Sequence, residues 1–218
     1  MGQGKLCPPF KGGIMELIGI TVGVVNSRNN DLVDACRRSI NRQWYDERLI
    51  EYIEIDNIKK EKSIGKCYNE IVEKATKDWI LFVGDDDLIS RMYLLNLSGF
   101  YNAFMEKGKD EPVAVTTNIA LYSEDKLITI DAVPQGMWNR KFLLENKFDE
   151  TLPRYVDAEM FERVEKLGKT IIHDITNSGY YYRQHTDNVS GNKFERKGGI
   201  MRLMKERIER NKKYGIVI

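Results

Sequence analysis

Three consecutive aspartates, Asp85, Asp86 and Asp87, are the residues of this sequence whose types and spacing most clearly indicate chemistry. Adjacent carboxylates repel one another, so this arrangement is costly unless a cation or hydrogen-bond donors compensate. Hard divalent cations such as Mg²⁺ and Mn²⁺ prefer oxygen ligands and commonly share one or two carboxylates with substrate phosphates. The triplet therefore indicates a metal held against a diphosphate. The alternative is a solvated acidic turn in which Asp87 or Ser90 caps the following helix.

The composition is that of a globular protein, with 42% apolar and 31% charged residues in a chain of 218. The 34 basic and 33 acidic residues nearly cancel, so no overall charge favours nucleic acid or an anionic membrane. Three cysteines without Cys-x-x-Cys spacing argue against a disulfide framework or a structural zinc site and favour a cytoplasmic location. No stretch reaches the roughly 18 apolar residues of a membrane span.

The elements that must position the aspartates alternate between short apolar runs and helical periods. The apolar runs predict three strands, and the periods between and after them predict three helices. This β-α-β-α-β-α order predicts an α/β fold, a mostly parallel sheet with helices on both faces. The expected strands are 17–25, 50–55 and 79–83, and the expected helices are 31–43, 64–77 and 90–108.

The second half of the chain is less regular. Short apolar runs predict a mixed edge of the sheet with a hairpin around residues 123–125, and a further helix closed by Gly168. The expected strands are 113–115, 119–122, 127–133 and 170–175, and the expected helix is 156–167. Neither a repeat nor a linker interrupts the chain, so we expect one domain over 15–192. Residues 1–14 are expected to be an extension or a disordered arm, and 193–218 a basic amphipathic helix.

Polar clusters follow each of the first three predicted strands. Residues 26–29 follow the first strand, Asp56 and Asn57 follow the second, and the aspartate triplet follows the third. Ligands of open parallel sheets bind beyond the carboxyl ends of the strands. The sequence therefore predicts that the three clusters line one pocket.

The block from Thr76 to Ser90 resembles the corresponding block of family-2-type inverting glycosyltransferases with the GT-A fold. In that family an apolar strand ends in a metal-binding Asp-x-Asp-type motif. The blocks 20–29, 53–57 and 63–69 resemble further family segments in the same order. The segments 136–143, 148–150 and 156–163 are similar to its acceptor-side part. The resemblance spans roughly residues 17 to 190, and it implies a UDP-sugar as the donor and transfer with inversion to an acceptor hydroxyl.

The resemblance also implies residues for the donor. Ser27 and Asn29 stand at the family's nucleotide-contacting positions, and we place Arg28, between them, in the same donor-binding turn. Asp56 stands where the family has an aspartate that contacts the base. These four residues are therefore expected to bind the nucleotide.

For the metal, alignment on the family motif favours Asp86 as the direct ligand, with Asp87 in the same site. Asp85 is then expected to face the ribose or a metal-bound water. His185 lies in a late segment that resembles a loop closing over the nucleotide. It could be a third ligand or donate to a phosphate, while the alternative is an ordinary surface histidine. The cofactor implied is Mn²⁺ or Mg²⁺.

Asp157 falls where the family has its catalytic base, at the start of a predicted helix. A positioned carboxylate can take the proton of the attacking hydroxyl, which is what a single displacement requires. Glu159 is the reserve candidate for this base. The alternative for Asp157 is capping of the helix, a position at which aspartate is favoured anyway.

Four positions depart from the family pattern. Asn26 replaces a usual proline, Gly84 takes the place of the first aspartate of many relatives, and Val156 replaces a glutamate. Tyr68 stands where the family often has an arginine, and Lys66 is the candidate to replace that contact. The changes at Gly84, Tyr68 and Val156 keep open a binding module without turnover.

A second alternative is a nucleotidyltransferase of related fold, although residues 26–29 lack the Gly-rich phosphate loop that it normally needs. Two other residues are expected to be structural first: His173 in an apolar strand, and Trp138, which could otherwise stack on an acceptor sugar. Residues 193–213 are expected to pack on the domain with a solvated basic face. The alternative is a surface for anionic lipid or nucleic acid, so the acceptor stays open among glycans, lipid-linked sugars, proteins and nucleic acid.

Overall fold

Three parallel strands form the part of the sheet from which the candidate residues extend. In the computed structural model, β1 (Ile20–Asn26) lies between β2 (Ile50–Asp56) and β3 (Trp79–Gly84). Every residue of β1 is buried, as expected for an apolar run covered on both faces. The three strands predicted in the first half of the sequence are thus present, and they pair in parallel as expected.

The structure describes residues 16–28, 30–123, 126–152 and 155–184. The predictions for residues 1–14, for Asn29, for His185 and for a helix over 193–218 lie outside this part of the chain. The statements below concern the described residues.

The rest of the sheet is mixed. The long hairpin of β5 (Ala114–Ser123) and β6 (Lys126–Asn139) adds to β3 through an antiparallel pairing of β6. Strands β7 (Ile171–Asp174) and β8 (Tyr180–Arg183) both pair parallel with β5, and the short β4 (Leu88–Ile89) pairs antiparallel with β8. The result is an eight-stranded sheet in the order β2-β1-β3-β6-β5-β8-β4, with β7 beside β5.

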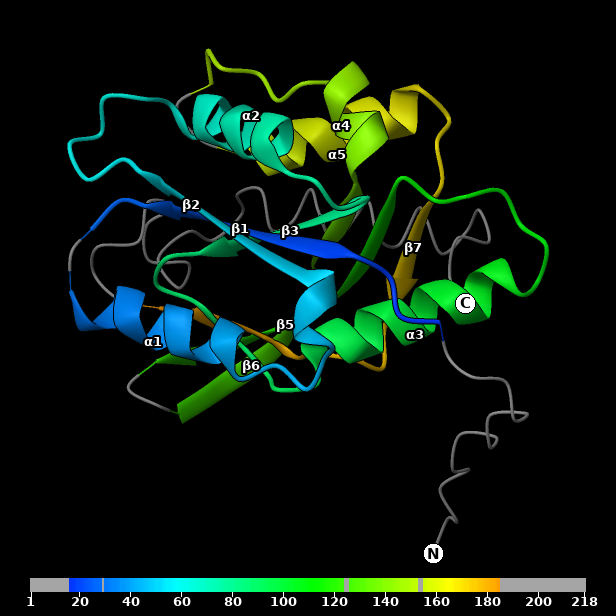
Figure 1. The fold of residues 1–218 in the computed structure, drawn as a ribbon, viewed down its shortest axis with the longest axis horizontal. Helices are drawn as coiled ribbons and strands as arrows, with labels where there is room; N and C mark the ends of the chain where they lie inside the picture. Colours follow the sequence, from blue (N-terminus) through cyan, green and yellow to red (C-terminus); the bar gives the residue numbers. More distant parts are fainter. Residues whose placement is uncertain (1–15, 29, 124–125, 153–154, 185–218) are drawn as a thin grey trace, which may run out of the picture.

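Helices cover both faces of this sheet, as Figure 1 shows. One face carries α2 (Ile64–Lys74), α4 (Arg140–Glu145) and α5 (Val156–Lys166). The other carries α1 (Asp31–Asn41) and α3 (Tyr93–Met105). A single turn of 3₁₀-helix, Glu47–Leu49, leads into β2. The expected α/β fold, a mixed sheet between helical layers, is therefore observed.

Alternation along β3 divides the core in two. Trp79, Leu81 and Val83 belong to the cluster beneath α1 and α3, while Ile80 and Phe82 belong to the cluster beneath α2, α4 and α5. Successive side chains of a strand point to opposite faces, so one six-residue strand serves both cores. This double burial fixes β3, and with it the turn that carries the aspartates.

Some predicted boundaries were wrong. The first helix starts at Asp31 as predicted, with Asn30 as its N-cap accepting from Leu32 N, but α1 ends at Asn41 and α2 at Lys74, before the predicted 43 and 77. Ser90 does not cap α3: the N-cap is Met92, without a side-chain hydrogen bond, and β4 occupies the preceding residues. The backbone of Ser90 is used instead by its neighbours, since its N donates to Gly179 O at 2.8 Å.

Two predicted glycine positions agree with the structure. Gly108 and Gly168, which follow α3 and α5, have φ values of +66° and +63°. These are left-handed conformations that glycine adopts without a steric penalty. Among the described residues, no helix has the length and apolar character needed to cross a bilayer.

Candidate functional site

The three polar clusters meet at one edge of the sheet. Asn26 of β1 is in register with Asp56 of β2, and Val25 is in register with Gly84 of β3. All three strands are parallel, so their carboxyl ends lie side by side. The expected convergence of the clusters is therefore observed.

Asp85 is held by the turn that follows β1. Its Oδ2 accepts from Ser27 N at 2.7 Å and from Ser27 Oγ at 2.9 Å, and its Oδ1 lies 3.2 Å from Arg28 Nε. Burial raises the pKa of Asp85, an effect that Ser27 and Arg28 oppose. The carboxylate is thus buried and compensated by fixed donors.

Asp86 shares the same cation. Its Oδ2 lies 3.0 Å from Arg28 Nη1, so one guanidinium bridges two neighbouring carboxylates. The planar fork of arginine suits such double pairing. The sequence placed Arg28 in the nucleotide-binding turn, and the structure also makes it the cation that neutralises the aspartate cluster.

Asp87 contacts β8. Its Oδ2 accepts from Tyr180 Oη at 2.8 Å, and its Oδ1 accepts from Arg183 N at 2.9 Å. The same Tyr180 hydroxyl accepts from Gly84 N at 3.0 Å. Asp87 therefore joins the aspartate turn to β8. Sequence reasoning missed Tyr180, for which the only available signal was the run of three tyrosines before the late segment.

Gly84 leaves room for these carboxylates. A Cβ at this position would lie 2.6 Å from Asp87 Oδ2 and 3.1 Å from Asp86 Oδ1. Real Cβ atoms do not approach an oxygen so closely, so any side chain here would displace the turn. The departure from the family's first aspartate consequently has a steric reason in this chain.

Asp157 comes to the same region through Tyr68. Burial raises the pKa of the Tyr68 hydroxyl, and the negative charges of Asp157, Asp87 and Asp85 raise it further. Tyr68 also packs against the core cluster that contains Phe82 of β3 and Val156, the residue before Asp157. Its ring packs on Phe82 and Phe148, with centroid distances of 4.3 and 5.2 Å.

The helix that carries Asp157 begins with an unusual backbone. Tyr155, its N-cap, has φ of +63°, a left-handed conformation that costs a non-glycine residue energy. Asp157 lies in the first turn rather than at the N-cap, and its Oδ1 accepts from Ala158 N at 2.9 Å, while the N-cap itself makes no side-chain hydrogen bond.

Glu159, the reserve base, has a different environment. Arg163, one turn further along α5, pairs with both of its oxygens, with Nε 3.0 Å from Oε1. Both oxygens of Glu159 are thus already engaged by Arg163. Glu159 therefore stays the reserve candidate for the base.

The two remaining residues that were predicted to bind the nucleotide-sugar donor are exposed. Asp56 lies at the correct edge, and its Oδ1 accepts from Ile58 N at 3.0 Å in the turn after β2. Lys66 is exposed in the first turn of α2, where its N donates to Ser63 Oγ at 3.2 Å. No described contact joins either side chain to the aspartates.

The two residues expected to be structural first have packing or hydrogen-bonding partners. His173 Nδ1 lies 2.9 Å from Thr116 Oγ1, and Nε2 lies 3.0 Å from Asn118 Oδ1. Trp138 is buried and packs on Phe161, with ring centroids 4.9 Å apart. No described contact joins either side chain to Asp85, Asp86 or Asp87, which lie at the carboxyl ends of the parallel strands.

The possible metal ligands around Asp85, Asp86 and Asp87 meet the requirements of a hard divalent cation only in part. In the described ranges no three carboxylate, imidazole or thiol groups converge as a complete metal site. Mg²⁺ and Mn²⁺ often bind through one or two carboxylates and take their other ligands from water and substrate phosphates. Asp86, with Asp85 beside it, satisfies that smaller requirement.

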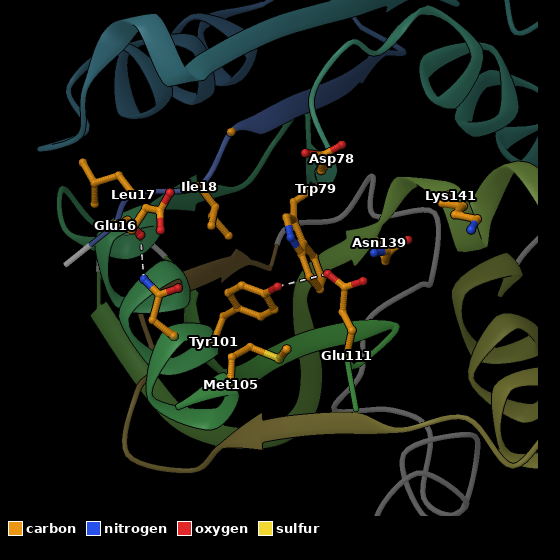
Figure 2. Close-up of a pocket in the computed structure, with 12 residues that line it drawn as sticks. Glu16, Leu17, Ile18, Asp78, Trp79, Tyr101, Met105, Glu111, Asn139 and Lys141 are labelled. Atoms are coloured by element: carbon orange, nitrogen blue, oxygen red, sulfur yellow. Dashed lines mark hydrogen bonds between the residues drawn. The ribbon is translucent and has the colours of Figure 1, made fainter. Parts of the chain in front are cut away.

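A pocket of about 590 Å³ lies at the other end of the parallel strands. Figure 2 shows its lining by Ile18 before β1, Trp79 at the start of β3 and Tyr101 of α3, with Asp78 and Glu111 among the other lining residues. Tyr101 Oη donates to Glu111 Oε1 at 3.0 Å. This pocket is separated from the aspartates by the length of β1, about 20 Å at 3.3 Å per residue.

Comparison with known proteins places the fold among glycosyltransferases. No family model and no curated protein sequence matches the chain. S. aureus TarS 1–349 in complex with UDP-GlcNAc aligns with a TM-score of 0.64 at 14% identity, covering 79% of this chain and 61% of that one. The mannosyltransferase PcManGT from Pyrobaculum calidifontis, in complex with GDP-Man and Mn²⁺, gives 0.59 at 12% identity, covering 77% and 57%.

At these identities the likeness concerns the fold. The chain also spans less than two thirds of the structures that it matches, 37% in the case of one structure of TarS. The mixed sheet flanked by helices is thus a fold shared with glycosyltransferases, as the resemblance in the sequence implied.

Proposed function

We propose that this chain is a metal-dependent, inverting glycosyltransferase that uses a nucleotide-sugar donor, a UDP-sugar in the first instance. The observation that carries the proposal is the buried aspartate turn after β3. Asp85, Asp86 and Asp87 are only 4%, 8% and 3% exposed, yet they stand at the edge where ligands of such sheets bind. Burying three adjacent acids is costly, and a cation bound as part of the function would offset that cost.

In this proposal the three aspartates have separate tasks. Asp86 is the direct metal ligand, and Asp85 stands beside it, oriented by Ser27. Asp87 holds the turn against β8 through Tyr180. When bound, the cation neutralises the charge that develops on the diphosphate leaving group.

Arg28 is proposed to act with these aspartates on the donor. Its guanidinium compensates Asp85 and Asp86 in the structure, at 3.2 and 3.0 Å. A diphosphate brings negative charge of its own, and arginine pairs well with phosphate oxygens. Arg28 is therefore expected to turn to the donor phosphates when the cation takes over the carboxylates.

Asp157 is proposed as the general base. Two observations support this role: Val156, the residue before Asp157, packs in the same core cluster as Phe82 near the end of β3, and the charge of Asp157 raises the pKa of the Tyr68 hydroxyl. Asp157 would take the proton of the attacking acceptor hydroxyl. The solved structures of similar fold that contain UDP-GlcNAc, UDP or GDP-Man with Mn²⁺ support the donor class, but the acceptor is not indicated by them.

Calorimetric titration of the full chain with UDP in the presence of Mn²⁺ tests the donor site. We expect Asp86→Asn to weaken binding by at least the roughly tenfold loss that even outer-shell metal partners cause. Asp34→Asn, an exposed acid on α1, is the control and should bind like the wild type. Undiminished binding by Asp86→Asn would contradict the assignment.

Donor hydrolysis separates an enzyme from a binding module, since water can replace the unknown acceptor. Asp157→Asn should lower the rate by about 100-fold or more while UDP affinity stays unchanged. Glu162→Gln, an exposed acid of the same helix, is the matched control. A wild type that binds UDP but does not hydrolyse any sugar nucleotide in a panel would support the binding module instead.

A further inference from the structure

An exposed tryptophan lies on the α1 side of the molecule. Trp44 follows α1 and is 61% exposed, whereas Trp79 and Trp138 are 2% and 5% exposed. Met92, at the start of α3, is 41% exposed. The two segments are joined by a hydrogen bond from Trp44 N to Arg91 O at 2.7 Å. Two large apolar side chains are thus presented to solvent from adjoining segments.

The backbone around Trp44 is firmly held. The Gln43 side chain donates to Ser90 O at 2.8 Å and accepts from Leu94 N at 3.2 Å. On the other side, Tyr45 Oη donates to Ile18 O at 2.7 Å, and its ring packs against the core. Both neighbours of Trp44 therefore point inward, and its exposure follows from a fixed segment.

Exposed arginines lie on the two segments that meet at this tryptophan. Arg42 and Arg91 are exposed, and Arg38 lies one turn before Arg42 on α1, also exposed. On that helix Arg37 reaches β2 through Glu54, and Ser39 Oγ accepts from Ile89 N of β4. At 100° per residue, Arg38 and Arg42 then project away from the core.

These arginines carry uncompensated charge. None of the three forms an ion pair with a described residue, whereas Arg37 and Arg48 do. Asp46, the nearest acid after Trp44, is paired with Arg48, and Glu47 is the acid that follows it. The surface is basic around an apolar centre.

We propose that five residues, which we call the Trp44 patch, form a docking surface for a membrane rich in anionic lipids. Indole and guanidinium groups are suited to the boundary between headgroups and acyl chains, where one part is apolar and the other polar. The patch comprises Trp44, Met92, Arg38, Arg42 and Arg91. The inference is independent of the proposed function.

A lipid surface fits this patch better than a protein partner does. Stable protein interfaces usually bury more than about 1,000 Å² around an apolar core, and two side chains do not provide that. Reversible binding to a bilayer needs only a few inserted side chains together with basic residues nearby. The basic charge also matches the negative potential of phosphatidylserine-containing bilayers.

Tryptophan fluorescence provides a direct test, because only Trp44 of the three tryptophans is exposed. The full chain is mixed with vesicles of phosphatidylcholine alone or with phosphatidylserine, with and without brominated acyl chains. We expect a blue shift and quenching by the brominated lipid only on the anionic vesicles. Trp44→Phe should abolish both signals.

Co-sedimentation measures the arginine contribution. Neutralising all three arginines of the patch to Gln should weaken binding by about fivefold for each charge. The control replaces three exposed lysines elsewhere, Lys59, Lys107 and Lys109, by Gln and should bind like the wild type. Circular dichroism verifies that each variant is folded.

Three outcomes would overturn the proposal. One is no binding to anionic vesicles. Another is binding without quenching of Trp44, which would indicate that a different basic segment, such as 193–213, makes the contact. The third is a Trp44-dependent dimer in size-exclusion chromatography without vesicle binding, which would make the patch a protein interface.

Discussion

The carboxyl and amino ends of the parallel strands place acidic side chains in opposite environments. At the carboxyl end, Asp85, Asp86 and Asp87 are all less than 10% exposed and are held by side-chain and backbone donors. At the amino end, Asp78 and Glu111 line the pocket of about 590 Å³ but remain exposed. A pocket with solvated acids costs the fold little, whereas buried acids must be compensated. The more costly arrangement is therefore the better indicator of function.

Replacing Asp87 is expected to cause the largest loss of stability. Asp87→Ala leaves Tyr180 Oη and Arg183 N without their acceptor, so the free energy of unfolding should fall by about 2–4 kcal/mol. Urea denaturation measures this change. Asp86→Asn should lose much less stability, because Arg28 keeps its pairing with Asp85. Equal losses in the two variants would remove the distinction between a structural and a metal-binding aspartate.

Substitutions of glycine at the two ends of the parallel strands are expected to differ next most in their cost to stability. Gly84→Ala introduces a Cβ 2.6 Å from Asp87 Oδ2, and overpacking of this kind typically costs about 1–3 kcal/mol. At the amino end, a Cβ at Gly19 would meet the flexible Lys77 side chain at 3.0 Å, which can move aside. Thermal denaturation of both alanine variants tests this, and a Gly19→Ala variant as unstable as Gly84→Ala would contradict it.

A change in stability of similar size or smaller is expected when Arg28 is replaced, and Arg28 and the metal are expected to compete for the same two carboxylates. Arg28→Met removes the cation that bridges the buried Asp85 and Asp86, at a cost in stability of about 1–3 kcal/mol, because Asp85 keeps its two Ser27 donors. Because the two carboxylates then lack this compensation, Mn²⁺ alone should raise the melting temperature of the variant more than that of the wild type. Lys59→Met, at an exposed lysine in the turn after β2, is the control. An identical response to Mn²⁺ would indicate that the metal does not bind at these aspartates.

The smallest changes in stability are expected for substitutions in the pocket at the amino ends of the parallel strands. Asp78→Asn and Glu111→Gln change exposed side chains, so each should alter stability by no more than about 0.5 kcal/mol. UDP binding should be unchanged in both. A marked loss of UDP affinity in either variant would show that the amino-end pocket takes part in donor binding.

Much of the first half of the fold could be predicted because its signals are local. A strand buried on both faces reads as a continuous apolar run, as β1 and β3 do. The pairing of β4 with β8 could not be predicted, since β4 has two residues and its partner is about 90 positions away. Ser90 looked like a cap because its residue type is common there, but its backbone is bonded to Gly179.

The candidate site was predictable in its location and less so in its internal contacts. Strand order alone brings Asn26, Asp56 and the aspartates to one edge. That Arg28 would bridge Asp85 and Asp86, and that Tyr180 would hold Asp87, depends on side-chain placement between segments far apart in the sequence. No periodic pattern in the sequence indicates such contacts.

The Tyr180 hydroxyl sets a limit on where a mobile proton can reside. It has one hydrogen, which it donates to Asp87, while its oxygen accepts from Gly84 N. Burial and the charge of Asp87 raise the pKa of this phenol, so the hydrogen stays on Tyr180 at neutral pH. Arg183 N donates to the other oxygen of Asp87. Both oxygens of Asp87 thus accept from protein donors, so in the proposed enzyme we assign transfer of the acceptor's proton to a different carboxylate, that of Asp157.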